Sequence, residues 1–131
     1  MPNITTFDTT KPYMYLPVCV ESSYGTRHEF DAIFDTGAPR TEFSDRALKY
    51  AGFLSDTQDV AIPNGLQTYK YDRIILPSIT ICGHEIKHLD VFVSLFEESW
   101  GIHALIGLDF LRRFRTEIDY SKGMLVTTLL A

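Results

Sequence analysis

The chain has 131 residues, the size of one ordinary domain that can bury a core of its own. Its apolar fraction of 45% is typical of a globular protein, and its net charge of −5 argues against a nucleic-acid surface, which needs clustered Lys and Arg. The one basic cluster, at residues 112–115, is short and suits the solvated end of a helix. No apolar run approaches the roughly 18 residues of a membrane-spanning helix. We therefore expect neither a nucleic-acid nor a membrane partner.

The first half of the chain is expected to form strands joined by turns. Residues 14–21 are rich in β-prone side chains, the polar stretch 22–25 supplies a turn, and residues 28–34 return as a second strand. Pro17 has no N–H to donate to a ladder, so we expect it at a strand edge or a bulge. A short helix follows at residues 44–52, where Ser44 and Gly52 are suitable terminal residues.

The second half is expected to continue with a hairpin and short strands. Asn64-Gly65 lies between two extended arms and is a strong hairpin signal. Further strands are expected at residues 74–76, 79–81, 89–93, 116–120 and 124–128, with a turn at 82–85. Between them the apolar strand that begins at Ala104 ends at Gly107, and a helix follows because Leu108 and Leu111 fall at helical spacing.

Cysteine content and the first residues bear on location. Cys19 and Cys82 are too few for a disulfide framework, so both are expected to be buried, reduced thiols. The first six residues have neither the basic nor the apolar region of a signal peptide. Together these features favour the cytoplasm.

The most informative motif is Asp35-Thr36-Gly37-Ala38, which follows the apolar run at residues 30–34. A carboxylate placed where a strand breaks into a glycine turn is held stiffly and points out of the sheet, which suits acid–base chemistry. The Asp-Thr-Gly tripeptide occurs once in the chain. If this carboxylate works as one of a pair, its partner must come from a second copy of the chain.

The wider context of the motif resembles the retropepsin-like aspartic proteases, which are single-lobed, dimeric relatives of pepsin. An apolar strand precedes the motif, a short helix follows it, and the apolar segment Leu105-Ile106-Gly107 lies well downstream. The resemblance covers nearly the whole chain. It implies one mostly β domain over residues 1–131, a closed-barrel acid-protease lobe with one or two short helices. Residues 1–12 would be an arm that is flexible or contacts the dimer partner.

The resemblance also implies a reaction and its residues. Asp35 would be the catalytic group, and two copies, one from each subunit of a homodimer, would share a proton and activate a water that hydrolyses a peptide bond. No metal or cofactor is implied. The residues expected to support the active site are Thr36, Gly37, Ala38, Leu105, Ile106 and Gly107. A hairpin flap would contact the peptide or protein substrate through Ile62, Asn64 and Gly65.

The chain departs from the retroviral members at two places. Pro39 stands where they carry a substrate-contacting acid, and Leu108 stands where they carry the Arg that braces the dimer. The retroviral dimer mode and peptide specificity are therefore not carried over. The apolar C-terminal hairpin and tail are candidates for a dimer sheet. Asp109 is expected to be structural, hydrogen-bonded to the Asp35 loop at Thr41.

Several alternatives stay open at this point. Asp35 could be an ordinary turn carboxylate, and Trp100 could be a half-buried anchor or the wall of a substrate pocket. The four histidines show no ligand-like clustering, so no metal site is expected. The rival functions are a retropepsin-like module that dimerises and binds a peptide without cutting it, and a small-ligand barrel unrelated to proteases.

Overall fold

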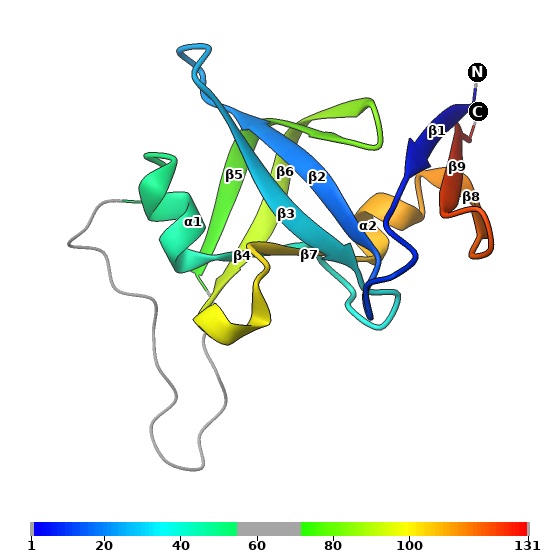
Figure 1. Ribbon diagram of the computed structural model, residues 1–131. Coiled ribbons are helices and arrows are strands. Elements are labelled where there is room, and N and C mark those ends of the chain that lie inside the picture. The colour runs from blue at the N-terminus through cyan, green and yellow to red at the C-terminus, as the bar shows by residue number, and fades with distance from the viewer. Residues whose placement is uncertain (1, 55–71, 131) are drawn as a thin grey trace.

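The computed structural model of the chain describes residues 2–54 and 72–130, except for the side chain of Asp72. Six strands close into a barrel in the order β2-β3-β7-β4-β6-β5. They are β2 (Tyr15–Glu21), β3 (Arg27–Phe34), β4 (Glu42–Ser44), β5 (Asp72–Ile81), β6 (His84–Ser94) and β7 (Ala104–Ile106). Beside the barrel lies a sheet in the order β1-β9-β8, made of β1 (Asn3–Thr6), β8 (Phe114–Asp119) and β9 (Met124–Leu129) (Figure 1).

Three short helical segments complete the described structure. They are α1 (Asp45–Tyr50), the 3-10 helix η1 (Glu98–Trp100) and α2 (Leu108–Leu111), and α2 lies between the barrel and the three-stranded sheet (Figure 1). In the described part of the chain, no helix has the length and apolar content needed to cross a membrane. The expected fold class, a mostly β closed barrel with one or two short helices, is confirmed: the described residues form two short α-helices.

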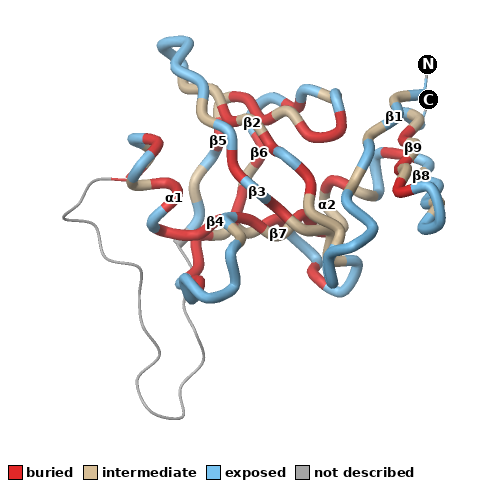
Figure 2. Tube along the Cα trace, viewed as in Figure 1, coloured by how far each residue is buried: buried red, intermediate tan, exposed pale blue. Residues whose placement is uncertain are grey.

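The hairpin of β2 and β3 follows the sequence pattern closely. Leu16, Val18 and Val20 alternate along β2 and are fully buried inside the barrel, whereas the residues between them are more exposed (Figure 2). Pro17 is exposed and comes just before Val18, the first residue of β2 that pairs with β5. Its missing N–H therefore falls where β2 has only one neighbour, as expected.

Strand β5 corrects one expectation. Residues 74–76 and 79–81, expected as two strands, are parts of one ten-residue strand that pairs with β6 on both sides of Pro77. Pro77 lies opposite His88, whose φ is 58°, so the ladder loses one step and then resumes in the same register. The turn after β5 is also tighter than expected: Cys82 and Gly83 alone make it, with φ of 52° and 78°.

Helix α1 begins and ends where the sequence indicates. The Ser44 hydroxyl accepts a hydrogen bond from the Ala47 N–H (3.3 Å), which caps the helix, and Gly52 follows its end with φ of 86°. Leu48 on the inner side of α1 is fully buried in the barrel core. The hairpin expected around Asn64-Gly65 lies outside the described residues.

The three-stranded sheet gives the N-terminal arm a defined place. Of residues 1–12, the segment Asn3–Thr6 is strand β1 and pairs with β9 of its own chain. Leu125 and Thr127 of β9 are fully buried, and the ring of Phe114 lies 4.3 Å from that of His84 on the barrel. The sheet therefore packs against the β5–β6 turn.

Candidate active site

Asp35 lies directly after β3, at one end of the barrel. Its N–H donates to the Ile106 carbonyl oxygen (2.9 Å), which fixes the start of the loop to β7. One carboxylate oxygen accepts the Gly37 N–H (2.9 Å), and the Asp35 carbonyl oxygen accepts the Ala38 N–H (3.1 Å). Asp35 is half-buried, whereas Thr36 and Gly37 are exposed. The turn thus holds an oriented carboxylate at the surface.

Strand β7, the neighbour of β3 in the barrel, supports this loop. It runs parallel to β3, pairing Ile33 with Leu105 and Phe34 with Ile106. Gly107 then approaches the loop so closely that a Cβ there would lie 2.7 Å from the carbonyl oxygens of Ala38 and Arg40. Only a glycine fits without moving the backbone of the loop.

Asp109 ties the far side of the loop to α2. One carboxylate oxygen accepts the Thr41 N–H (3.0 Å), and the other accepts the Thr41 hydroxyl (2.8 Å) and the Phe110 N–H (2.8 Å). The Leu108 N–H donates to the Ala38 carbonyl oxygen (2.8 Å). The expected contact between Asp109 and Thr41 is confirmed. Asp35, Thr36, Gly37 and Ala38 are therefore held between β7 and α2.

An apolar pocket of about 490 Å³ opens near the ends of β3 and β7, just before the Asp35 loop. Its floor includes Ile33 and Leu105, which are partners in adjacent strands, and Ile33 precedes Asp35 by two residues. The other lining residues are Pro12, Tyr13, Tyr15, Ser99, Trp100 and Ile102. Trp100 is 49% exposed, and its ring packs against that of Phe96 with 5.6 Å between the ring centroids. Trp100 therefore lines this pocket and is anchored at the same time.

A second apolar groove, of about 510 Å³, lies next to Thr36 and extends to the inner face of β8. Phe34, Leu108, Leu111 and Ile118 line it, with Tyr13 at the border to the first pocket. The tyrosines at positions 13 and 15 were not identified as site residues from the sequence. Their spacing of two in a β-prone stretch was the one available signal.

Other expected site features can be placed only in part. The flap residues Ile62, Asn64 and Gly65 lie outside the described residues. Within residues 2–54 and 72–130, no three His, Cys, Asp or Glu side chains are placed to hold a metal ion. His103 lies near the barrel end, where its Nδ1 accepts the Asp31 N–H (3.2 Å), and His84 lies between the barrel and the sheet.

Comparison with solved structures identifies the fold. The chain is similar to a retropepsin-like aspartic protease from Rickettsia conorii, with a TM-score of 0.66 and 23% identity over 97% of this chain and 90% of that one. It is also similar to the retroviral protease-like domain of Ddi1 from Leishmania major, with a TM-score of 0.59 and 20% identity over 91% and 94% of the two chains. No protein-family model and no curated protein sequence matches the chain.

These likenesses show that the chain has the retropepsin-like fold, a closed barrel with the Asp35 loop at one end. Identities this low show the fold alone. The likenesses do not favour a small-ligand barrel of another fold, and activity and subunit arrangement need an argument from the site.

Proposed function

We propose that the protein is an aspartic endopeptidase that works as a homodimer. The observation that carries the proposal is the Asp35 loop itself: a half-buried carboxylate, oriented by the Gly37 N–H, at the end of a barrel strand in a retropepsin-like fold. The relative from Rickettsia conorii is itself described as an aspartic protease. Oriented carboxylates of this kind suit general acid–base catalysis.

The proposed mechanism needs two Asp35 side chains, one from each subunit. Two carboxylates about 3 Å apart cannot both carry a full charge, so they share one proton. The ionised member takes a proton from a water, which attacks the scissile carbonyl carbon, and the protonated member donates to the carbonyl oxygen. The C–N bond then breaks as the carboxyl that received the water proton gives it to the leaving amine, and the former carbonyl oxygen returns its proton to the other carboxylate. Thr36, exposed beside Asp35, is proposed to hydrogen-bond to the partner's loop.

The proposed substrate is an extended peptide that lies across the ends of both barrels. The apolar pocket beside Ile33 and Leu105 suits one side chain of that peptide. Ile62, Asn64 and Gly65, which lie outside the described residues, are proposed as further substrate-contacting residues. The proposed chemistry uses water as the nucleophile and requires no metal or cofactor, and the cytoplasmic location stays a prediction.

The test is cleavage of a diverse mixture of unfolded peptides between about pH 3.5 and 7.5, with wild type and Asp35→Asn compared at equal concentration. We expect cutting by wild type and none by the variant, because Asn cannot exchange a proton with water or substrate. Cutting by both proteins would assign the activity to another nucleophile or to a contaminant. Peptide binding without cutting, in folded dimers of both, would favour a non-catalytic peptide-binding module.

A further inference from the structure

The loop between β6 and β7, residues 95–103, is fixed to the barrel at its C-terminal end. The His103 N–H donates to the Asp31 carbonyl oxygen (2.8 Å), and the His103 carbonyl oxygen accepts the Ser44 N–H (2.8 Å). Near its other end, Phe96 is buried. Between these points the loop carries Trp100 and Ile102, which form one wall of the apolar pocket at Ile33, two residues before Asp35.

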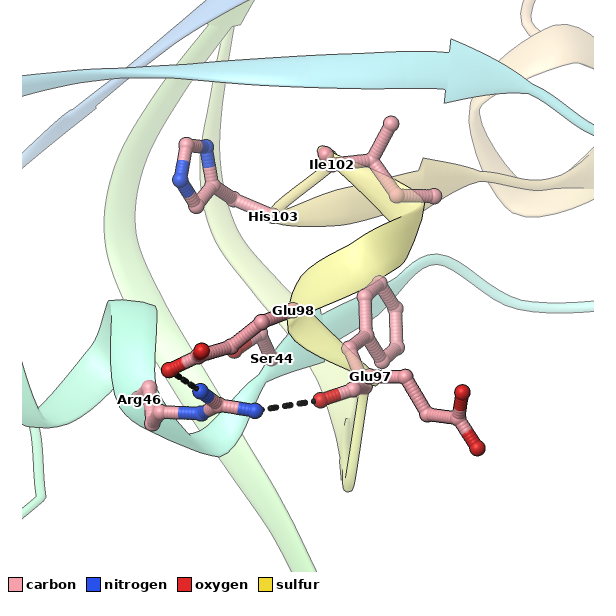
Figure 3. A pocket seen from close by; sticks show the side chains of 8 residues that line it. Ser44, Arg46, Glu97, Glu98, Ile102 and His103 are labelled. Atoms are coloured by element: carbon pink, nitrogen blue, oxygen red, sulfur yellow. Dashed lines mark hydrogen bonds and ion pairs between the residues drawn. The ribbon is translucent and has the colours of Figure 1, made fainter.

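Arg46 of helix α1 holds the N-terminal half of this loop, at Phe96 and Glu98. One guanidinium nitrogen donates to the Phe96 carbonyl oxygen (2.8 Å), and the other makes an ion pair with the Glu98 carboxylate (Figure 3). These two bonds span the start of η1, and the planar guanidinium donates to both groups from one fixed fork. We call this pair of bonds the Arg46 clamp.

The carbonyl bond is the stronger restraint of the two. The Arg46 and Glu98 side chains are 51% and 85% exposed, and an exposed ion pair alone contributes little because water and salt screen it. Phe96, by contrast, is buried, and the centroid of its ring lies 5.6 Å from that of Trp100. A bond to the Phe96 carbonyl therefore fixes the residue against which Trp100 packs.

We propose that Arg46 is a positioning residue for the substrate: the Arg46 clamp fixes the loop whose Trp100 lines the pocket at Ile33, two residues before Asp35. The inference rests on the proposed peptidase function. The consequence for catalysis follows from the geometry of the pocket. Ile33 and Leu105 belong to paired strands and cannot move independently, so the width of the pocket depends on its other walls, of which Trp100 is one. A loosened loop would hold a bulky apolar side chain less well.

The chain supplies its own reporter, because Trp100 is its only tryptophan. Acrylamide quenching of the fluorescence would be measured for wild type, Arg46→Ala, Arg46→Lys and Glu98→Gln, with Lys87→Ala as the control. Lys87 is an exposed cation on β6, outside the loop and the pocket. Acrylamide should quench Trp100 fluorescence more strongly in Arg46→Ala than in wild type. Arg46→Lys should show intermediate quenching because Lys lacks the planar fork of donors, and Glu98→Gln should be quenched about as much as wild type.

Kinetics would be measured on two peptides that differ only in the residue next to the cut, one large and aromatic and one small. For Arg46→Ala we expect the KM of the aromatic peptide to rise about tenfold with kcat nearly unchanged, because binding is lost equally in the ground and transition states. The KM of the small peptide should barely change, and Lys87→Ala should match wild type on both peptides.

Two results would overturn the proposal: quenching of Arg46→Ala equal to that of wild type in the folded protein, or altered quenching with unchanged KM values for both peptides. Failure of the proposed peptidase function would look different, because wild type itself would then leave every peptide intact. In that case the quenching still decides whether Arg46 holds the loop, and unchanged quenching would overturn the clamp as well.

Discussion

A single carboxylate, Asp109, holds the far side of the loop that carries Asp35. It accepts three hydrogen bonds, two of them from Thr41. Asp109→Asn keeps the shape but turns one acceptor into an N–H₂ donor that faces another donor. We expect the free energy of unfolding to fall by about 1–3 kcal/mol, the usual cost of leaving a buried polar group without its partner. Thermal and urea unfolding of the two proteins would measure it.

Thr41→Val is the matched control for Asp109→Asn. It removes only the hydroxyl, which also accepts the Gly107 N–H at 3.3 Å, and leaves the Thr41 N–H free to bond to Asp109. It should cost less than Asp109→Asn. If Asp109→Asn unfolded at the wild-type midpoint and kept full activity, the bracing role of Asp109 would be wrong.

Gly107 sets how closely β7 approaches the Asp35 loop. Because a Cβ there would lie 2.7 Å from two backbone carbonyl oxygens of the Asp35 loop, Gly107→Ala must push that loop outward. We expect a loss of about 1–3 kcal/mol from overpacking, with a larger fall in peptide cleavage because the displaced backbone carries Asp35. Cleavage assays and thermal unfolding, read together, would separate the two effects.

Gly25→Ala provides the comparison for Gly107→Ala. Gly25 has φ of 86° and nothing within 4 Å of its Cβ position, so alanine there brings backbone strain without crowding. It should lower stability and leave cleavage by the folded protein intact. Equal loss of cleavage in both variants would show that Gly107 acts through stability and not through the position of Asp35.

Residues differ in how far the sequence could predict them. Local motifs or the likeness to a family indicated three features that the structure has: the Asp35 turn, the Ser44 cap and the Thr41–Asp109 contact. The Arg46 clamp joins residues that lie 50 and 52 positions apart. Exposed polar pairs at such separation leave no periodic pattern, so no sequence signal indicated it.

At the scale of elements, strand content and local pairs were predictable, whereas pairing between strands far apart in the chain was not. The β-prone residues of β2 and β3 and the polar turn between them indicated two strands joined by a turn, and the structure pairs them. The barrel closes through β4, which pairs with β6 in parallel and with β7 in antiparallel orientation. Neither pairing is local, so periodicity gave no register for it. The prediction divided β5 at Pro77 because the low strand propensity of proline usually marks the end of a strand. A β-ladder nevertheless tolerates one missing N–H donor.

His84 couples two elements and makes their contact depend on pH. Its Nε2 bonds to the Thr127 hydroxyl of β9 (2.8 Å), and its Nδ1 faces the Asn3 amide nitrogen of β1 (3.4 Å). Partial burial lowers the pKa of His84 below its ordinary value, and hydrogen bonding to the Thr127 backbone opposes this less strongly. The folded state therefore binds this proton less readily than the unfolded state does.

The sign of the pH effect follows from that lowered pKa. Above the ordinary histidine value of about 6.5 the ring is neutral in both states; below it the unfolded chain is protonated first, so stability falls as the pH drops toward the folded pKa. As the pH falls from about 7 to 5, we expect the Tm of wild type to drop relative to the Tm of His84→Gln. Carboxylates are common to both proteins, so they cancel in the difference. A difference independent of pH would contradict this role.

At the scale of the whole molecule, one chain holds half of the proposed active site. It contributes a single Asp35 in an Asp-Thr-Gly motif, with the exposed Thr36 next to an apolar groove lined by Phe34, Leu108 and Leu111. The sequence indicated the need for a second copy because the motif occurs once. It did not indicate the geometry of assembly, because the C-terminal hairpin expected in a dimer sheet already pairs with β1 of its own chain.

Mixing wild type with Asp35→Asn tests whether two Asp35 side chains act together. If subunits exchange freely and each active site needs one Asp35 from each chain, equal amounts leave about a quarter of the dimers wholly wild type. Adding an equal amount of the variant at constant wild-type concentration should therefore halve the activity, although the number of wild-type chains is unchanged. If each Asp35 acted alone, the variant would leave activity unaltered. Dilution gives an independent reading, since specific activity should fall below the dissociation constant of the dimer and recover on reconcentration.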